Sequence, residues 1–138
     1  MPQDTTTTSW AATPEGSTTM ADDVVATIAG IAAREVPGVF ALGGSAARAV
    51  AVVRERTPRS RPDLATGVHA TVGETQAVVD VVLVAEYGSD VVDVAAGVRR
   101  EVAAAVRRMT DLTVTEVNVT VQDLHLPVEG EDPAERVR

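Results

Sequence analysis

The sequence predicts an α+β domain of two layers, in which helices pack on one face of a small three-stranded mixed sheet. Apolar residues recur at helical spacing near the N-terminus and over residues 91–109, and they follow strand patterns over 68–72, 76–87 and 112–123. The order is helix, short helix, strand, strand, long helix, strand. Because the long helix connects the last two strands, these should run parallel, either adjacent or with one strand between them.

The composition limits the function classes. The chain has 138 residues, a net charge of −8, no cysteine, and only Trp10, Phe40 and Tyr87 as aromatics. The charge disfavours general binding to nucleic-acid phosphates, and the lack of cysteine excludes disulfides and thiol chemistry. The N-terminus does not resemble a secretory signal, and no uncharged apolar run approaches the ~20 residues of a membrane span. We therefore expect a cytoplasmic protein without direct transmembrane insertion.

Two helices are expected before the first strand. The first begins near residue 21 with two aspartates, which the helix dipole favours, and is stopped by Pro37–Gly38. Val39 and Phe40 are expected to fold back as apolar plugs. After a glycine pair, Ser45 can cap a shorter helix that runs to about Arg56, although the valines of this segment would also suit a strand.

The long strand at 76–87 follows a hairpin connection at 73–75 and is apolar on both faces. One face consists of small and branched apolar residues, namely Ala77, Val79, Val81, Leu83 and Ala85. The opposite face alternates valine with acidic residues: Val78, Asp80, Val82, Val84 and Glu86. Helices packed on the first face cannot cover the valines of the second, and no other cover is evident in the chain.

The long helix and the last strand follow directly. Asp90 can cap the helix, which is expected to run to about Met109 with that residue facing inward. The last strand directs its valines to the core and shows Glu116 and Asn118 on the other face. Because asparagine is poorly suited to strand interiors, Asn118 is expected to make a cross-strand hydrogen bond or to contact a partner.

Residue types that carry chemistry are sparse. His69 and His125 have neither the spacing nor the companion ligands of a metal site. Asp80 and Glu86 share a strand face, but no nucleophile or oxyanion donor accompanies them, so a structural hydrogen bond is favoured over acid–base work. The glycines form no nucleotide-binding motif. We expect no catalytic residue, no metal and no cofactor.

One basic cluster stands out in this acidic chain. It lies in and after the expected short helix and consists of Arg48, Arg54, Arg56, Arg59 and Arg61. A solvated loop face is the favoured interpretation. The alternative is a nucleic-acid-binding module that uses Arg54, Arg56, Arg59 and Arg61, although nucleic acid is not the partner that the net charge favours. Binding in a gel shift that weakens steeply with salt would support this alternative.

Three segments resemble a known bacterial family: DDVVATIAGIAAREVPGV, GVHATVGETQAVVDVVLVAEYG and VRRMTDLTVTEVNVTVQD. Together they are similar to the Asp23/Gls24 family of alkaline-shock and envelope-stress proteins over roughly residues 20–124. The resemblance implies an abundant cytosolic protein that is not an enzyme and that self-associates. It also implies contact with the cytoplasmic face of the membrane through a membrane-anchored protein partner, and support of envelope homeostasis under stress.

The residues and the resemblance together give one hypothesis. Residues 21–126 form the domain, between a disordered N-terminal tail at 1–20 and an acidic disordered tail at 127–138. The domain forms a homo-oligomer or binds a partner through the exposed face of the long strand. The expected surface consists of Val78, Val82 and Val84, framed by Asp80, Glu86, Glu116 and Asn118.

Overall fold

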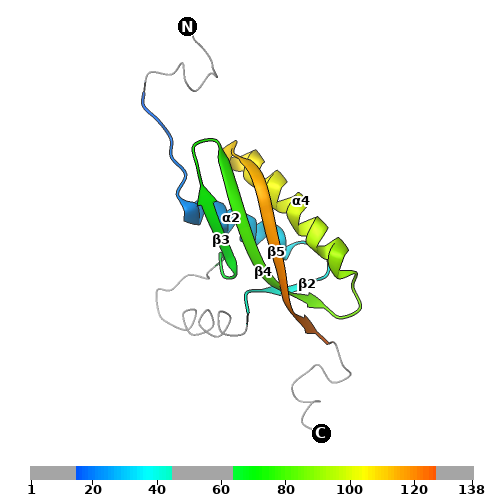
Figure 1. Ribbon diagram of the computed structural model, residues 1–138. Helices are drawn as coiled ribbons and strands as arrows, with labels where there is room; N and C mark the ends of the chain where they lie inside the picture. The colour runs from blue at the N-terminus through cyan, green and yellow to red at the C-terminus, as the bar shows by residue number, and fades with distance from the viewer. Residues whose placement is uncertain (1–14, 45–63, 127–138) are drawn as a thin grey trace, which may run out of the picture.

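The computed structural model describes residues 15–44 and 64–126, and it confirms the two-layer α+β architecture (Figure 1). The tails and the predicted short helix at 45–56 lie outside the described residues, apart from 15–20, which precede the first described helix. The described elements, in chain order, are α2 (Asp22–Arg34), β2 (Val39–Leu42), β3 (Val68–Val72), β4 (Gln76–Glu86), α4 (Val91–Thr110) and β5 (Thr113–His125).

The sheet is mixed and is organised around β4. β5 runs parallel to β4 along its whole length, which confirms the predicted parallel pair and shows that the two strands are adjacent. The other edge of β4 is shared by two shorter antiparallel strands, β3 along its first half and β2 along its second half. Within the described residues the sheet therefore has four strands instead of the three predicted.

The additional strand is β2, which includes the residues expected to fold back as plugs. Val39 pairs with Ala85 and Ala41 pairs with Val84, so that Phe40 between them lies in a bulge. The prediction of apolar plugs was wrong at this point. A strand of four residues that is interrupted by a bulge is too short to give a period-two pattern in the sequence.

β2 and β3 meet end to end opposite Val82. The amide of Val82 donates to the carbonyl of Gly67 at 2.8 Å, and its carbonyl accepts from the amide of Gly43 at 2.6 Å. Gly67 has a φ of +81°, and a Cβ at this position would collide with the backbone of Gly43. Only glycine fits this junction without displacing one of the two strands.

The core lies between the sheet and the two helices. All five predicted inward residues of β4, from Ala77 to Ala85 at alternate positions, are almost completely buried. α2 contributes Val25 and Ala29, and α4 contributes Val98 and Val102. Burial of each such valine stabilises the fold by roughly 1.5–3 kcal/mol. No polar or charged side chain of the described residues is buried, so this core depends on apolar packing.

At each of the two outer edges of the sheet, a charged side chain from a helix forms a hydrogen bond with the strand backbone. The Asp22 carboxylate at the start of α2 accepts from the amide of Val72 at 3.0 Å, on the outer edge of β3. Arg99 Nε on α4 donates to the carbonyl of Val117 at 3.1 Å, on the outer edge of β5. Because these backbone groups are occupied, they are not available for pairing with another strand.

The junction of β2 and β3 can be tested with two glycine variants. Gly88 also has a positive φ, +97°, but a Cβ there would meet nothing within 4 Å. Gly88→Ala should therefore cost only the left-handed strain, about 1–2 kcal/mol. Gly67→Ala should cost a further ~1–3 kcal/mol because of the steric collision. Urea unfolding measures both, and equal losses would contradict the tight junction.

Candidate interaction surfaces on the sheet and between the helices

The face of the sheet opposite the helices is the first candidate surface, and we call it the open face. Figure 1 looks onto it, with α2 and α4 behind the strands. The alternation of β4 places its second set of residues on this face: Val78, Asp80, Val82, Val84 and Glu86. Register places Glu116 beside Val78, and Asn118 beside Asp80. The structure thus brings all seven predicted surface residues onto one side of two neighbouring strands.

A polar cluster occupies the centre of the open face. Asn118 Nδ2 donates to Asp80 Oδ1 at 2.9 Å and lies 3.4 Å from Glu116 Oε1. The cross-strand hydrogen bond predicted for Asn118 is confirmed. Asn118 is exposed and Asp80 is half-buried, and neither Asp80 nor Glu116 has an ion-pair partner among the described residues. The two carboxylates therefore share one amide and have no ion-pair partner among the described residues.

The valines of the open face are not equivalent. Val78 and Val82 are half-buried, whereas Val84 is only 3% exposed. The rings of Phe40 and His125 stack with centroids 3.7 Å apart and planes inclined by 4°. Because Phe40 belongs to β2 and His125 to β5, the stacked rings meet over β4. Val84, which the sequence had placed in the exposed stripe, lies at this end of β4, with Ala41 and Asp123 as its register partners.

The stacked pair is fixed by a hydrogen bond. His125 Nδ1 lies 3.1 Å from Glu86 Oε1, and the two residues are register partners on β5 and β4. His125 was expected to follow the last strand but is its final residue. The end of the open face is therefore held together by the chain itself, which leaves Val78 and Val82 as the accessible apolar part.

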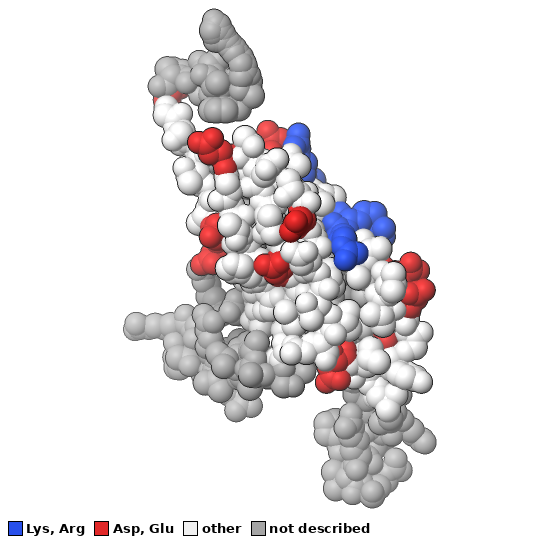
Figure 2. All heavy atoms as spheres, in the orientation of Figure 1, with Lys and Arg blue, Asp and Glu red and all other residues white. Residues whose placement is uncertain are grey.

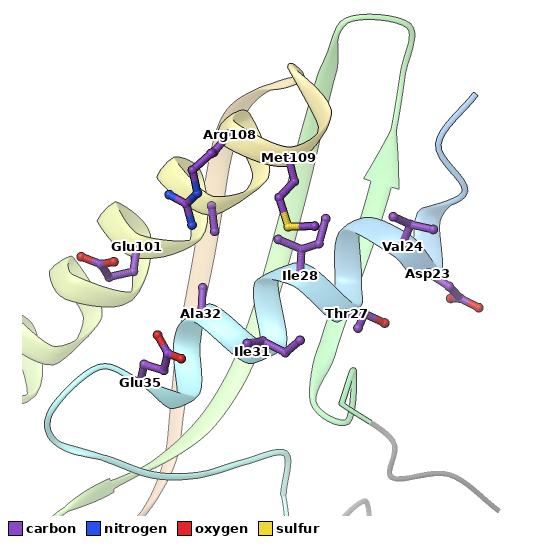
Figure 3. A pocket seen from close by; sticks show the side chains of 11 residues that line it. Asp23, Val24, Thr27, Ile28, Ile31, Ala32, Glu35, Glu101, Arg108 and Met109 are labelled. Carbon is purple, nitrogen blue, oxygen red and sulfur yellow. The ribbon is translucent and has the colours of Figure 1, made fainter. Parts of the chain in front are cut away.

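A groove between α2 and α4 is the second candidate surface, and the sequence analysis did not predict it. It has a volume of about 550 Å³. Figure 3 shows the side chains of Ile28 and Met109 approaching each other at one end, with Glu35 and Glu101 at the other. Met109 was expected to face the core, but it is 66% exposed at the end of α4. The other apolar residues that line the groove are Val24, Ile31, Ala32 and Ala105.

The remaining predicted residues do not form a site in the described part of the chain. Arg48, Arg54, Arg56, Arg59 and Arg61 all lie outside the described residues. His69 is exposed on β3, in register with Asp80. Over residues 15–44 and 64–126 no three histidine, cysteine or acidic side chains are grouped so that they could hold a metal ion.

Acidic side chains are more widely distributed than basic ones, and they occur on both layers, including Asp93 and Glu101 of α4. Figure 2 shows acidic side chains scattered over the open face, whereas the basic ones gather along the α4 side. Every described arginine belongs to a helix, namely Arg34 of α2 and Arg99, Arg100, Arg107 and Arg108 of α4. The fold and these surfaces define a small α+β domain with an open sheet face and a groove between its two described helices.

This domain has a known family. The chain belongs to the Asp23 family, described as having a cell envelope-related function, and the family model matches residues 11–126. The resemblance noted in the sequence is thereby confirmed. Within the described residues, neither helix is both long enough and apolar enough to cross a membrane.

Several curated relatives match the chain. The "Stress response regulator gls24 homolog" of Streptococcus pyogenes is 34% identical over 109 residues, which are 79% of this chain and 59% of that protein. The "Uncharacterized protein YqhY" of Bacillus subtilis is 28% identical over 117 residues, 85% of this chain and 83% of that protein. The chain thus spans somewhat more than half the length of the streptococcal relatives.

Among solved structures, variants of a domain titled "MamM CTD" match 73% of this chain and 93% of that one. Their sequence identity is 14% and the TM-score is 0.47, values at which the similarity supports no argument about function.

The stacking of Phe40 on His125 can be tested with a double-mutant cycle of Phe40→Ala and His125→Ala. We expect a coupling of about 0.5–1.5 kcal/mol in the free energy of unfolding, because the two rings stack. The control pairs Phe40→Ala with Tyr87→Ala, since Tyr87 is 61% exposed and lies outside the stack. That pair should be additive, and additivity of the first pair would rule out an energetic role for the stack.

Proposed function

We propose that this protein is a non-catalytic, self-associating scaffold of the cytoplasm that supports cell-envelope homeostasis under stress. An anchored partner protein holds it at the cytoplasmic face of the membrane. The observation that carries the proposal is the open face, where half-buried valines and carboxylates without a described cationic partner lie on two neighbouring strands. A family described as envelope-related and a relative named as a stress response regulator give the cellular context.

Self-association is supported by the position of Val78 and Val82. Both lie on the central strand, on the face that the helices do not cover. Covering apolar area of this kind is the main favourable term in protein association. The polar residues around it, Asp80, Glu116 and Asn118, would form the rim of the contact, as is usual at protein interfaces.

Recruitment by a partner is favoured over direct lipid binding. The chain carries a net charge of −8, and anionic lipid headgroups attract basic segments. An acidic domain therefore gains little from the membrane surface itself. A protein that is anchored in the membrane avoids this repulsion because it can bind the domain through a specific contact.

The absence of catalysis is also part of the proposal. The closest carboxylates of the open face, Asp80 and Glu116, both lie near the amide of Asn118. An amide between two carboxylates orders them by hydrogen bonding but provides neither a nucleophile nor a base that would activate one. The arrangement suits positioning of charges at an interface.

Val82→Asp tests self-association through the open face. The backbone hydrogen bonds of Val82 do not depend on its side chain, so the fold should persist while a buried carboxylate opposes the contact. We expect light scattering to show a shift to monomer with an unchanged circular dichroism spectrum. Val82→Thr, which keeps the branched shape without a charge, should shift the equilibrium less.

Ile31→Asp is the control for the second surface. It places the same charge in the groove between the helices, where Ile31 is 42% exposed. Association should survive this change. If Ile31→Asp dissociates the protein and Val82→Asp does not, the groove is the interface. If Val82→Asp unfolds the chain, the valine belongs to the core and the proposed surface is wrong.

Membrane recruitment can be tested with lipid vesicles. The purified protein should not co-sediment with vesicles rich in phosphatidylglycerol at physiological salt, because like charges repel. Co-sedimentation that disappears at high salt would demonstrate direct electrostatic binding and would contradict the need for an anchored partner.

A further inference from the structure

The open face carries negative charge that the described residues do not neutralise. Asp80 and Glu116 are held near one another through Asn118, with contacts of 2.9 and 3.4 Å. No described cation pairs with either carboxylate. Asp80 also lies between the two accessible valines, Val78 and Val82, along β4. Along this face of β4, an acidic side chain therefore lies between two apolar ones.

The outer surface of α4 carries two arginines, of which Arg100 has no partner among the described residues. Arg100 is exposed and has neither a hydrogen bond nor an ion pair with any described residue. Arg107 follows about two turns later on the same side of the helix. Its contacts are with Asp111 at 3.5 Å and Thr113 at 2.8 Å, both on the surface. We call Arg100, Arg107 and the alanines between and before them, Ala96 and Ala103, the α4 ridge.

These two charged surfaces cannot meet within one chain. α4 packs against the opposite face of the sheet through the buried residues Val94, Val98 and Val102. Arg100 is exposed and lies on the side of α4 away from these buried residues. Arg107 lies on the same side but reaches Thr113 at the start of β5. The carboxylates of the open face lie on β4 and β5, on the face of the sheet that the helices do not cover. Pairing between the two sets therefore requires two molecules.

We propose that the open face of one molecule binds the α4 ridge of a second copy of this chain. The inference rests on the proposed self-association and names both halves of the contact. The spacing is compatible: Val78 and Val82 are ~13 Å apart with Asp80 midway, and Ala96 and Ala103 are ~10 Å apart with Arg100 between them. The small alanines allow the helix backbone to approach the valines while Arg100 reaches Asp80 and Glu116.

The contact is head to tail, because it joins two different surfaces. Each copy that binds through its open face retains a free α4 ridge, and each copy bound through its ridge retains a free open face. Association of this kind is not limited to two copies unless the rotation between neighbours closes a ring. The mass of the assembly should therefore rise with concentration beyond that of a dimer.

Two charge-reversal variants of the full chain test the contact. The ridge variant carries Arg100→Glu and Arg107→Glu, and the face variant carries Asp80→Arg and Glu116→Arg. In each variant alone, like charges oppose each other across the contact, so the dissociation constant should rise at least about tenfold. Analytical ultracentrifugation of each variant should show monomer at concentrations where the wild type associates.

Mixing the two variants gives the decisive result. The acidic ridge of one fits the basic face of the other, and the basic ridge fits the acidic face. An equimolar mixture should therefore recover assemblies larger than a dimer, with equal amounts of the two variants. A mixture that stays monomeric overturns the contact. So does a ridge variant that associates as well as the wild type, since a face-to-face contact would not use the ridge.

The matched control is Arg108→Glu. It reverses one charge on the same helix, against two in the ridge variant, but Arg108 lines the groove beside α2. Its association should match that of the wild type, and equal loss in this variant would show that only net charge matters.

The outcomes also separate the proposed self-association through the open face from the proposed contact with the α4 ridge. If Val82→Asp gives monomers and the ridge variant does not, self-association through the open face stands and this contact falls. If the wild type is monomeric throughout, both fall.

Discussion

The double pairing of β4 is the constraint on which the rest of this structure depends. One edge binds β5 along its whole length, and the other binds β3 and β2 in succession. At the junction of the two short strands, the amide of Val82 donates to the carbonyl of Gly67 and its carbonyl accepts from the amide of Gly43. With both edges occupied, β4 can be covered further only from its faces, and α2 and α4 cover one of them. The open face is what this arrangement leaves accessible.

The small side chains of the core explain why two helices suffice on the covered face. Valine and alanine allow close approach, and the backbone itself comes into contact where Gly30 of α2 meets the carbonyl of Leu64. The burial of the valines on the open face changes along the length of β4. Phe40 and His125 stack at the end where Val84 is buried, whereas Val78 and Val82 are half-buried and are flanked by polar residues. This contrast within one strand face supports a contact role for the accessible part.

Much of the fold follows from local sequence patterns, and each feature that was not predicted correctly has a physical cause. The elements α2, α4, β3, β4 and β5 and the hydrogen bond of Asn118 could be predicted because periodicity and residue type are local properties. β2 was missed because a four-residue bulged strand has no period. The burial of Val84 and the exposure of Met109 depend on contacts between distant segments, as does the groove between the helices. No pattern in a single stretch of sequence encodes such contacts.

The distribution of charge favours contact between unlike surfaces. All described arginines lie on the helices, whereas the open face carries Asp80, Glu86 and Glu116. Two copies that met face to face would place like carboxylates opposite one another in a partly desolvated contact, where repulsion is strong. A face that meets a helix layer would instead bring opposite charges together. The open face carries carboxylates, and the described arginines lie on the helices beside acidic residues such as Asp93 and Glu101. A contact between these unlike surfaces would give the proposed self-association a direction.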